Sequence, residues 1–261
     1  MILTHPGSPS PAPAGGVTAK SPLPTWLAAV ASLFLLGACA YQPSGNSGAG
    51  TGIDNPVERK FTWFSYLDAA DIRNSCAAGG PDQLRLIYNG QYKDHLRAYD
   101  ILGGAAPVLT ARARGTSGNL LAMEFGSFDE LLGPWNFRRS QTSLTPAQWG
   151  ELQDLLRQSG YATTVQAGMR LHSQDFYWLV AGCEGGQFHF NAWAAHSSST
   201  PLELAKFVEF LLRHDATGVR YRPPHTVTYA EKRGDSGGPD RNYAGSFTIT
   251  VHVDGIGRPG L

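Results

Sequence analysis

Three cysteines, eight histidines and a serine enclosed by glycines are the side chains of this chain best suited to chemistry. Cys39 directly follows an uncharged apolar run, whereas Cys76 and Cys183 lie far apart in the remaining sequence. Ser236 stands in a glycine-rich hexapeptide. A thiol, or a hydroxyl activated by a neighbouring base, can act as a nucleophile, and two thiols can form a disulfide. The positions of these residues relative to the predicted elements decide among these chemistries.

The apolar run over residues 25–38 carries no charge, and Lys20 precedes it. It is shorter than the roughly 20 apolar residues that a transmembrane helix needs, and it is typical of the central region of a secretory signal. The run ends in Leu36-Gly37-Ala38-Cys39, which resembles the lipobox of bacterial lipoproteins. The resemblance implies a thioether-linked diacylglycerol on Cys39, cleavage before it and acylation of the new amino terminus. The alternative is an ordinary signal peptide that is cut near Ala38 or Ala40.

The N-terminal region is predicted to contain a signal peptide over residues 1–38 and a tether over residues 39–58. Residues 1–16 fit neither a signal peptide nor a folded element, so Val17 is a candidate for the true translation start. Residues 39–58 are small, polar and rich in Gly, Ser and Pro. Such a composition cannot bury enough apolar surface to become ordered. We therefore expect a flexible, lipid-anchored link.

The charge balance bears on the class of partner, and the residue after Cys39 bears on which membrane holds the protein. The chain has 21 Lys and Arg against 21 Asp and Glu, and this balance argues against a nucleic-acid partner. Ala40, rather than an aspartate, follows Cys39. In the lipoprotein class that difference implies the outer membrane, so we expect anchoring there with the folded region facing the periplasm.

Cys76 and Cys183 are the thiols that remain beyond the predicted anchor. Two cysteines in an oxidising envelope readily form a disulfide. Two buried free thiols or a redox pair are the alternatives, although the sequence has no Cys-x-x-Cys motif. We predict a structural Cys76–Cys183 bridge.

Hydrophobic periodicity and turn residues predict a mixture of strands and helices. The Thr145-Pro146 and Thr200-Pro201 pairs each resemble a capped helix start, and Asn89-Gly90 is a strong hairpin signal. The predicted strands are 61–67, 84–88, 92–101, 108–114, 120–125, 176–183, 188–194, 226–230 and 247–253, and the predicted helices begin at Asp68, Ser127, Pro146 and Pro201.

These elements predict an α+β fold. Hairpins form a largely antiparallel sheet, and the amphipathic helices over 146–158 and 201–213 cover one of its faces. We expect the folded domain over residues 59–216. Residues 217–261, which are rich in glycine, are expected to form a C-terminal hairpin or a loose tail.

The hexapeptide Gly234-Asp235-Ser236-Gly237-Gly238-Pro239 resembles the nucleophile loop of trypsin-like proteases. The resemblance implies that Ser236 is the nucleophile and that the Gly234 and Ser236 amides form an oxyanion hole. The family needs a histidine and then an aspartate well before this loop. His196, in an Ala-Ala-His segment, lies too close in sequence, and His95 lacks the expected flanking residues. We therefore interpret the hexapeptide as a glycine-rich loop and keep a serine hydrolase as the alternative.

Other candidate sites are weaker. His189, Asn191 and Trp193 would share one strand face, which could bind a polar ligand or be covered by a neighbouring element. Arg112 and Arg114 could bind an anion, although paired arginines are more often solvated. The histidine spacings fit no common metal motif. The sequence has no G-x-x-x-x-G-K-[ST] and no G-x-G-x-x-G between a predicted strand and a predicted helix, so we expect no metal and no cofactor.

The sequence as a whole predicts a non-enzymatic protein of the cell envelope. Its anchor would be a lipid on Cys39, and its α+β domain would bind an envelope protein or a glycan, or serve a structural role. The ligand itself is left open.

Overall fold

The computed structural model describes residues 40–43, 52–115, 136–163, 165–226 and 247–257. The chain divides into Met1–Ala38 and Cys39–Leu261, and only the second unit contains described residues. The predicted signal peptide, Cys39 and the hexapeptide with Ser236 therefore lie outside them. So do the strand predicted over 120–125, residues 227–230 of the strand predicted over 226–230 and the helix start at Ser127.

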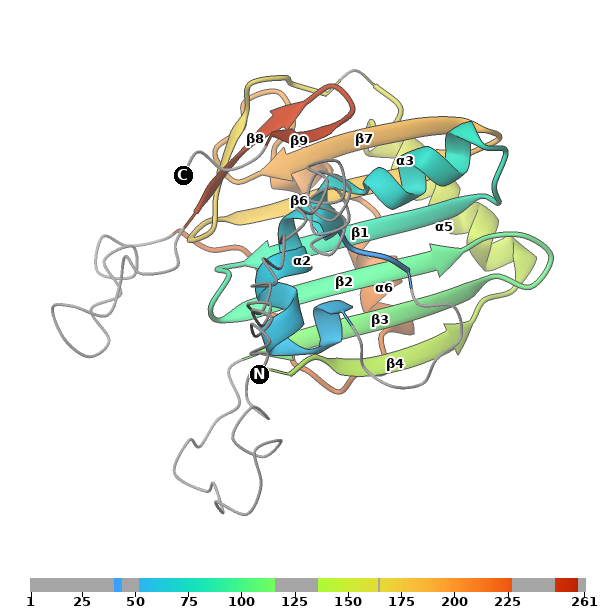
Figure 1. Cartoon of the computed structure of the whole chain (residues 1–261), viewed down its shortest axis with the longest axis horizontal. Coiled ribbons are helices and arrows are strands. Elements are labelled where there is room, and N and C mark those ends of the chain that lie inside the picture. The colour runs from blue at the N-terminus through green and yellow to red at the C-terminus, as the bar shows by residue number, and fades with distance from the viewer. Residues whose placement is uncertain (1–39, 44–51, 116–135, 164, 227–246, 258–261) are drawn as a thin grey trace, which may run out of the picture. The chain divides into compact units, whose positions relative to one another are not determined.

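A six-stranded antiparallel sheet forms the centre of the unit (Figure 1). Its order is β4-β3-β2-β1-β6-β7. The bounds are β1 Gln83–Gly90, β2 His95–Leu102, β3 Val108–Gly115, β4 Arg138–Ser143, β6 Phe176–Glu184 and β7 Gln187–Ala194. The predicted α+β fold is confirmed. β6 lies between β1 and β7, and other elements cover both faces of the sheet. The run over 176–183 is therefore apolar on both faces.

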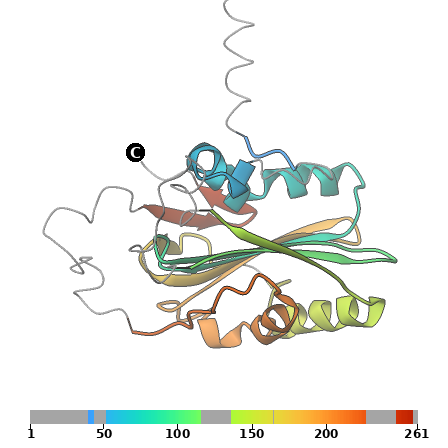
Figure 2. The same cartoon turned by 90° about the horizontal axis from the view of Figure 1, so that it is seen from below.

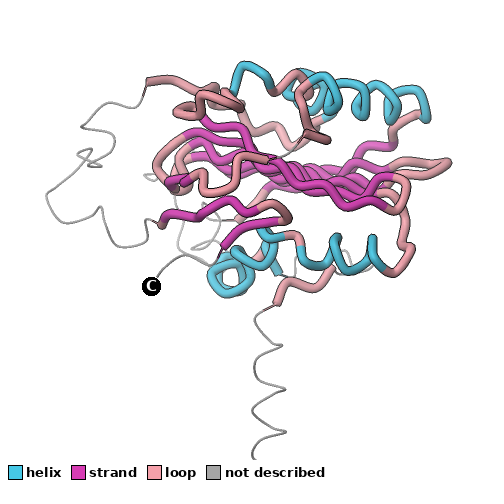
Figure 3. The backbone as a smooth tube through the Cα atoms, turned by 90° about the horizontal axis from the view of Figure 1, so that it is seen from above, coloured by secondary structure: helices cyan, strands magenta, loops and turns pink. Residues whose placement is uncertain are grey.

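Helices cover both faces of this sheet, as Figures 2 and 3 show. One layer holds α2 (Pro56–Asp68), α3 (Ala70–Ala77) and a small sheet of order β5-β8-β9. The bounds of its strands are β5 Arg170–His172, β8 Thr248–His252 and β9 Gly255–Gly257. The opposite layer holds α5 (Pro146–Gln158), η5 (Leu202–Leu204) and α6 (Val208–His214). The two predicted amphipathic helices thus share one face, but the other face is covered as well.

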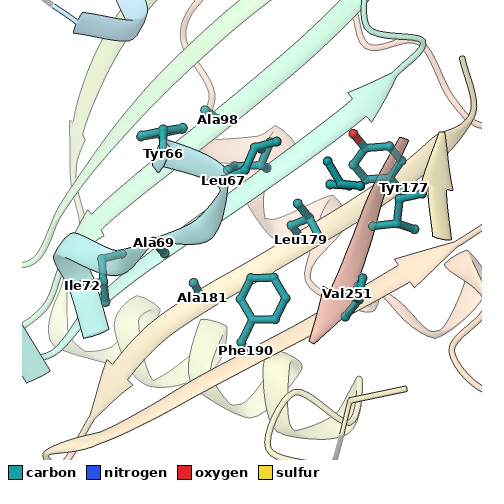
Figure 4. Close-up of a cluster of buried hydrophobic side chains, with 14 of the residues drawn as sticks. Tyr66, Leu67, Ala69, Ile72, Ala98, Tyr177, Leu179, Ala181, Phe190 and Val251 are labelled. Carbon is teal, nitrogen blue, oxygen red and sulfur yellow. The ribbon is translucent and has the colours of Figure 1, made fainter. Parts of the chain in front are cut away.

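Alternating side chains of the sheet enter two separate cores. In β6, for example, Leu179 and Ala181 face the α2 layer, whereas Trp178 and Val180 face the α5 layer. Figure 4 shows the first core, where Leu67 and Ile72 from the helices meet Leu179 and Ala181. Successive side chains of a strand point to opposite faces, so a sheet that is covered on both faces has apolar residues at consecutive positions.

The strand predicted over 61–67 is wrong, because these residues belong to α2. The cap lies upstream: the Asn55 side chain accepts from the Val57 amide at 2.9 Å, and Pro56 occupies the first turn. Trp63, Tyr66 and Leu67 then fall on one buried helix face at i, i+3 and i+4. The helix start therefore lies inside the stretch expected to be a tether.

Three further predictions need correction. The hairpin between β1 and β2 exists, but Asn89-Gly90 belongs to β1, and the turn follows at 91–94, where Gln91 has φ 66°. The helix predicted over 201–213 is broken into η5 and α6. The helix start predicted at Asp68 is wrong, because Asp68 is the last residue of α2 and α3 begins at Ala70 without a side-chain cap. The capping box at Thr145 is confirmed.

The C-terminal stretch is joined to the rest of the unit. The predicted strand over 247–253 is present as β8 (Thr248–His252), which pairs with β9 (Gly255–Gly257) and with β5 (Arg170–His172). Leu171 and Ile249 face each other in this register and are both buried. A strand of the expected tail therefore completes a small sheet with an earlier strand.

The predicted disulfide is confirmed. The Sγ atoms of Cys76 and Cys183 are 1.99 Å apart, and the bond joins α3 to β6 across 107 residues of sequence. Both cysteines are buried in the core on the α2 side of the sheet. The bridge therefore fastens the helical layer to a central strand.

We expect reduction of this bond to lower the free energy of unfolding by about 2–5 kcal/mol, because the unfolded chain regains the freedom that a 107-residue loop denies it. Urea unfolding with and without dithiothreitol measures the change. The matched control is a Cys76→Ala/Cys183→Ala double variant, which should be insensitive to the reductant. Equal stability of the oxidised and reduced wild type would contradict this role.

Candidate functional site

A half-buried carboxylate, Asp100 on β2, lies between two arginines of the neighbouring strands. Arg85 on β1 donates through Nε to Asp100 Oδ1 at 2.8 Å, and Arg112 on β3 donates through Nη1 to Oδ2 at 2.6 Å. Tyr66 of α2 adds a third bond from its hydroxyl at 2.9 Å. Register explains the arrangement, since Arg85 is directly opposite Asp100 on the face beneath α2.

Both arginines also reach the covering layer. Arg85 makes two bonds to the Asp71 carboxylate of α3, at 2.9 and 2.8 Å, and Arg112 binds Asp54 of η2 (Gly52–Asp54) at 2.8 Å. Burial raises the pKa of Asp100, but the two guanidinium groups outweigh it and hold that pKa below its ordinary value. Asp100 is therefore held as a carboxylate, and the described contacts of the cluster lie within the protein. It positions elements rather than presenting a reactive group.

Arg112 and Arg114 were expected to be solvated, and both are buried. Two arginines at alternate positions of an otherwise mostly apolar strand are the signal that could have indicated this burial. Both side chains point to the face of β3 that α2 and η2 cover.

Residues 40–43, at the start of the predicted tether, lie on the same face of the sheet as α2 and α3 (Figure 2). The Tyr41 amide donates to Ser65 Oγ at 2.7 Å, and its ring meets the Tyr66 ring edge-on at 4.8 Å. The Arg85 guanidinium lies 5.0 Å from the Tyr41 ring centre. Burial, with the Asp100 charge, raises the pKa of the Tyr41 hydroxyl to about 12. The predicted tether is thus docked at Tyr41.

An open cleft of about 230 Å³ lies where β6 begins and β7 ends, beside β5. Its polar lining includes the imidazoles of His172 and His196, the Asp175 carboxylate and the Gln166 amide. Met169, Leu171 and Phe176 contribute apolar surface. A small cleft with an apolar part and a few polar groups is a common form of ligand site.

His196 and Asp175 approach each other in this cleft, with His196 Nε2 3.7 Å from Asp175 Oδ1. The adjacent Ser197 hydroxyl lies 3.2 Å from Gln166 Oε1 and 3.1 Å from Thr200 Oγ1. Among the described residues no hydroxyl hydrogen-bonds to His196. The pair can bind a polar ligand, but the described groups do not activate a nucleophile.

Of the predicted face His189, Asn191 and Trp193, the last two residues are covered, whereas His189 is half-buried, so the three do not form an open ligand surface. Asn191 and Trp193 are fully buried, and they donate to the carbonyl oxygens of Gly160, at 2.8 Å, and Ser159, at 3.0 Å. These carbonyls follow the C-terminus of α5, where backbone acceptors are left free by the helix. These two polar side chains therefore close the C-terminal end of α5.

The described part of the chain contains no group of three or more His, Cys, Asp or Glu residues that could hold a metal ion. Within the same residues, no helix combines the length and apolar character needed to cross a membrane. Comparison with protein-family models, with curated proteins and with solved structures gave no match to the chain.

His95, the other histidine considered for catalysis, lies in the core and is 2% exposed. Arg97 Nε donates to its Nε2 at 3.0 Å, so the imidazole accepts and is neutral. Burial, followed by the charges of Arg97, Arg222 and Arg114, lowers its pKa to about 3, against the opposing effect of Asp215. His95 is therefore a structural acceptor.

This lowered pKa predicts acid sensitivity. Between the unfolded value of about 6.5 and the folded value of about 3, the unfolded state binds more protons, so acidification favours unfolding. From pH 6.5 to 4.5 we expect the wild type to lose about 2 kcal/mol more stability than His95→Gln, which keeps an acceptor but cannot titrate. Urea unfolding at both pH values tests this, and equal losses would contradict the buried neutral imidazole.

Proposed function

We propose that this protein is a lipid-anchored component of the cell envelope, with a non-catalytic α+β domain that binds a partner or ligand. The observation that carries the proposal is the Leu36-Gly37-Ala38-Cys39 sequence at the end of an uncharged apolar run. Its resemblance to a lipobox implies acylation of Cys39, and Ala40 favours retention at the periplasmic face of the outer membrane.

The Cys76–Cys183 disulfide supports export. Structural disulfides persist in oxidising compartments and are rare where thiols are kept reduced. A buried bond between α3 and β6 also suits a domain that works outside the cytoplasm, because it adds stability that does not depend on chaperones or ligands.

The cleft beside β5 is a candidate for ligand binding. It offers hydrogen-bond donors and acceptors from His172, His196 and Gln166 next to apolar side chains. A peptide segment or a glycan of the envelope has matching chemistry, since both combine polar groups with apolar patches. The buried Arg–Asp cluster, in contrast, is engaged with the fold.

We expect radiolabelled palmitate to enter the wild-type protein and not the Cys39→Ser variant, which should leave the membrane fraction. Acyl chains contribute about 0.8 kcal/mol per buried methylene, so two or three chains hold a protein firmly. The Cys76→Ser/Cys183→Ser variant is the matched control and should retain the label. A wild type without label, or a Cys39→Ser form that stays equally membrane-bound, would refute the anchor.

The alternative is a serine hydrolase that uses Ser236, which the hexapeptide match and the approach of His196 to Asp175 favour. A fluorophosphonate probe separates the two functions, because it reacts only with an activated serine. We expect no labelling of the oxidised, folded protein. Labelling that disappears in Ser236→Ala and persists in Ser197→Ala would establish the hydrolase instead.

A further inference from the structure

We infer that the outer surface of α2 lies against the lipid bilayer, with Phe61 and Val57 in contact with the membrane interface. This inference rests on the proposed acylation of Cys39 and adds an orientation to it. The docked position of Tyr41 and the distribution of exposed apolar side chains carry it.

The docked Tyr41 limits how far the domain can move from its anchor. Cys39 precedes Tyr41 by two positions, and an extended chain covers at most about 3.6 Å per residue, so their Cα atoms are within about 7 Å. The Tyr41 amide is bonded to Ser65 of α2, and its ring packs on Tyr66. An acyl chain on Cys39 would therefore enter the bilayer next to α2 and not at the end of a long link.

Ser65, which binds the Tyr41 amide, lies on the same side of α2 as two exposed apolar residues. Val57, Phe61 and Ser65 are spaced four residues apart, so they follow one another along the same side of α2. The fractional exposures of Val57 and Phe61 are 56% and 60%. One helical turn, about 5.4 Å, is the approximate spacing along this row. The anchored segment thus meets the helix on the side where its unpartnered apolar groups lie.

Most of the exposed large apolar side chains among the described residues lie on this layer of the domain. The described residues include five, and three of them, Val57, Phe61 and Val253, belong to the layer with α2, α3 and the small sheet. Val253 lies between β8 and β9, and the next residue, Asp254, accepts from Arg73 of α3 through its carbonyl. On the opposite layer, Leu204 of η5 is 40% exposed. It provides a matched position away from the anchor.

The charges beside Phe61 indicate that the contact is apolar rather than electrostatic. Lys60 and Glu58 are both exposed on α2 and carry opposite signs. Without a basic excess there is no strong attraction to anionic lipids. An interfacial apolar contact should therefore form on zwitterionic lipids, and a second copy of the chain is the competing occupant of the same surface.

A fluorescent amino acid, acridonylalanine, placed at position 61 or 204 of the full chain tests the orientation. The mature protein is purified from membranes and reconstituted into phosphatidylcholine vesicles with brominated acyl chains, which quench only fluorophores at the lipid. Both positions are exposed, so the core stays intact. Mass spectrometry of the N-terminal peptide from each sample reports acylation of Cys39.

We expect acylated protein to lose emission at position 61 and to keep it at position 204. Acylated Cys39 with no loss at position 61, or with equal loss at both positions, would overturn the orientation and leave the lipid anchor intact. The same holds if dilution of the protein in the vesicles restores emission at position 61, because self-association then covers the surface. Absence of acyl groups on Cys39 would overturn both the anchor and the orientation.

Discussion

The charge cluster around Asp100 is the constraint on which the arrangement of this domain depends. It connects β1, β2 and β3 to the helical layer through Arg85, Arg112 and their outer partners. Charges removed from water are tolerated only when they are paired, and removal of one partner of a buried pair costs about 3–5 kcal/mol. The helices consequently have one position on this half of the sheet at which every charge meets its partner, whereas apolar packing alone would allow sliding.

The second half of the same face is held differently. There, α3 is bonded covalently to β6, and the small sheet packs beside α2. Ion pairs over β1–β3 and the disulfide at β6 together hold the layer of α2 and α3 on the sheet, and Tyr41 packs on that same layer. On the opposite face, the layer of α5 and α6 is held by apolar packing and by the buried ion pair of Arg97 with Asp215.

Local patterns allowed most of the sheet to be predicted, because alternation and turn residues act over a few neighbours. The apolar run of β6 and the capped start of α5 are examples. The helix α2 was missed since an aromatic-rich stretch fits a strand equally well, and its cap, Asn55, stood in a segment with the composition of a linker. The candidate cleft was not predictable, because Asp175 and His196 come together only when β6 pairs with β7, and His172 joins the lining from β5. The pairing of Asp100 depends on strand register in the same way.

The bond between Cys76 and Cys183 has a consequence for damage by proteases. Every peptide bond between these residues lies inside a covalent ring of the chain. A single cut anywhere in that ring would leave the C-terminal piece attached to the N-terminal piece. If Cys39 carries the proposed lipid, a nicked molecule would keep both pieces at its anchor, and their separation would require a reductant as well as a protease.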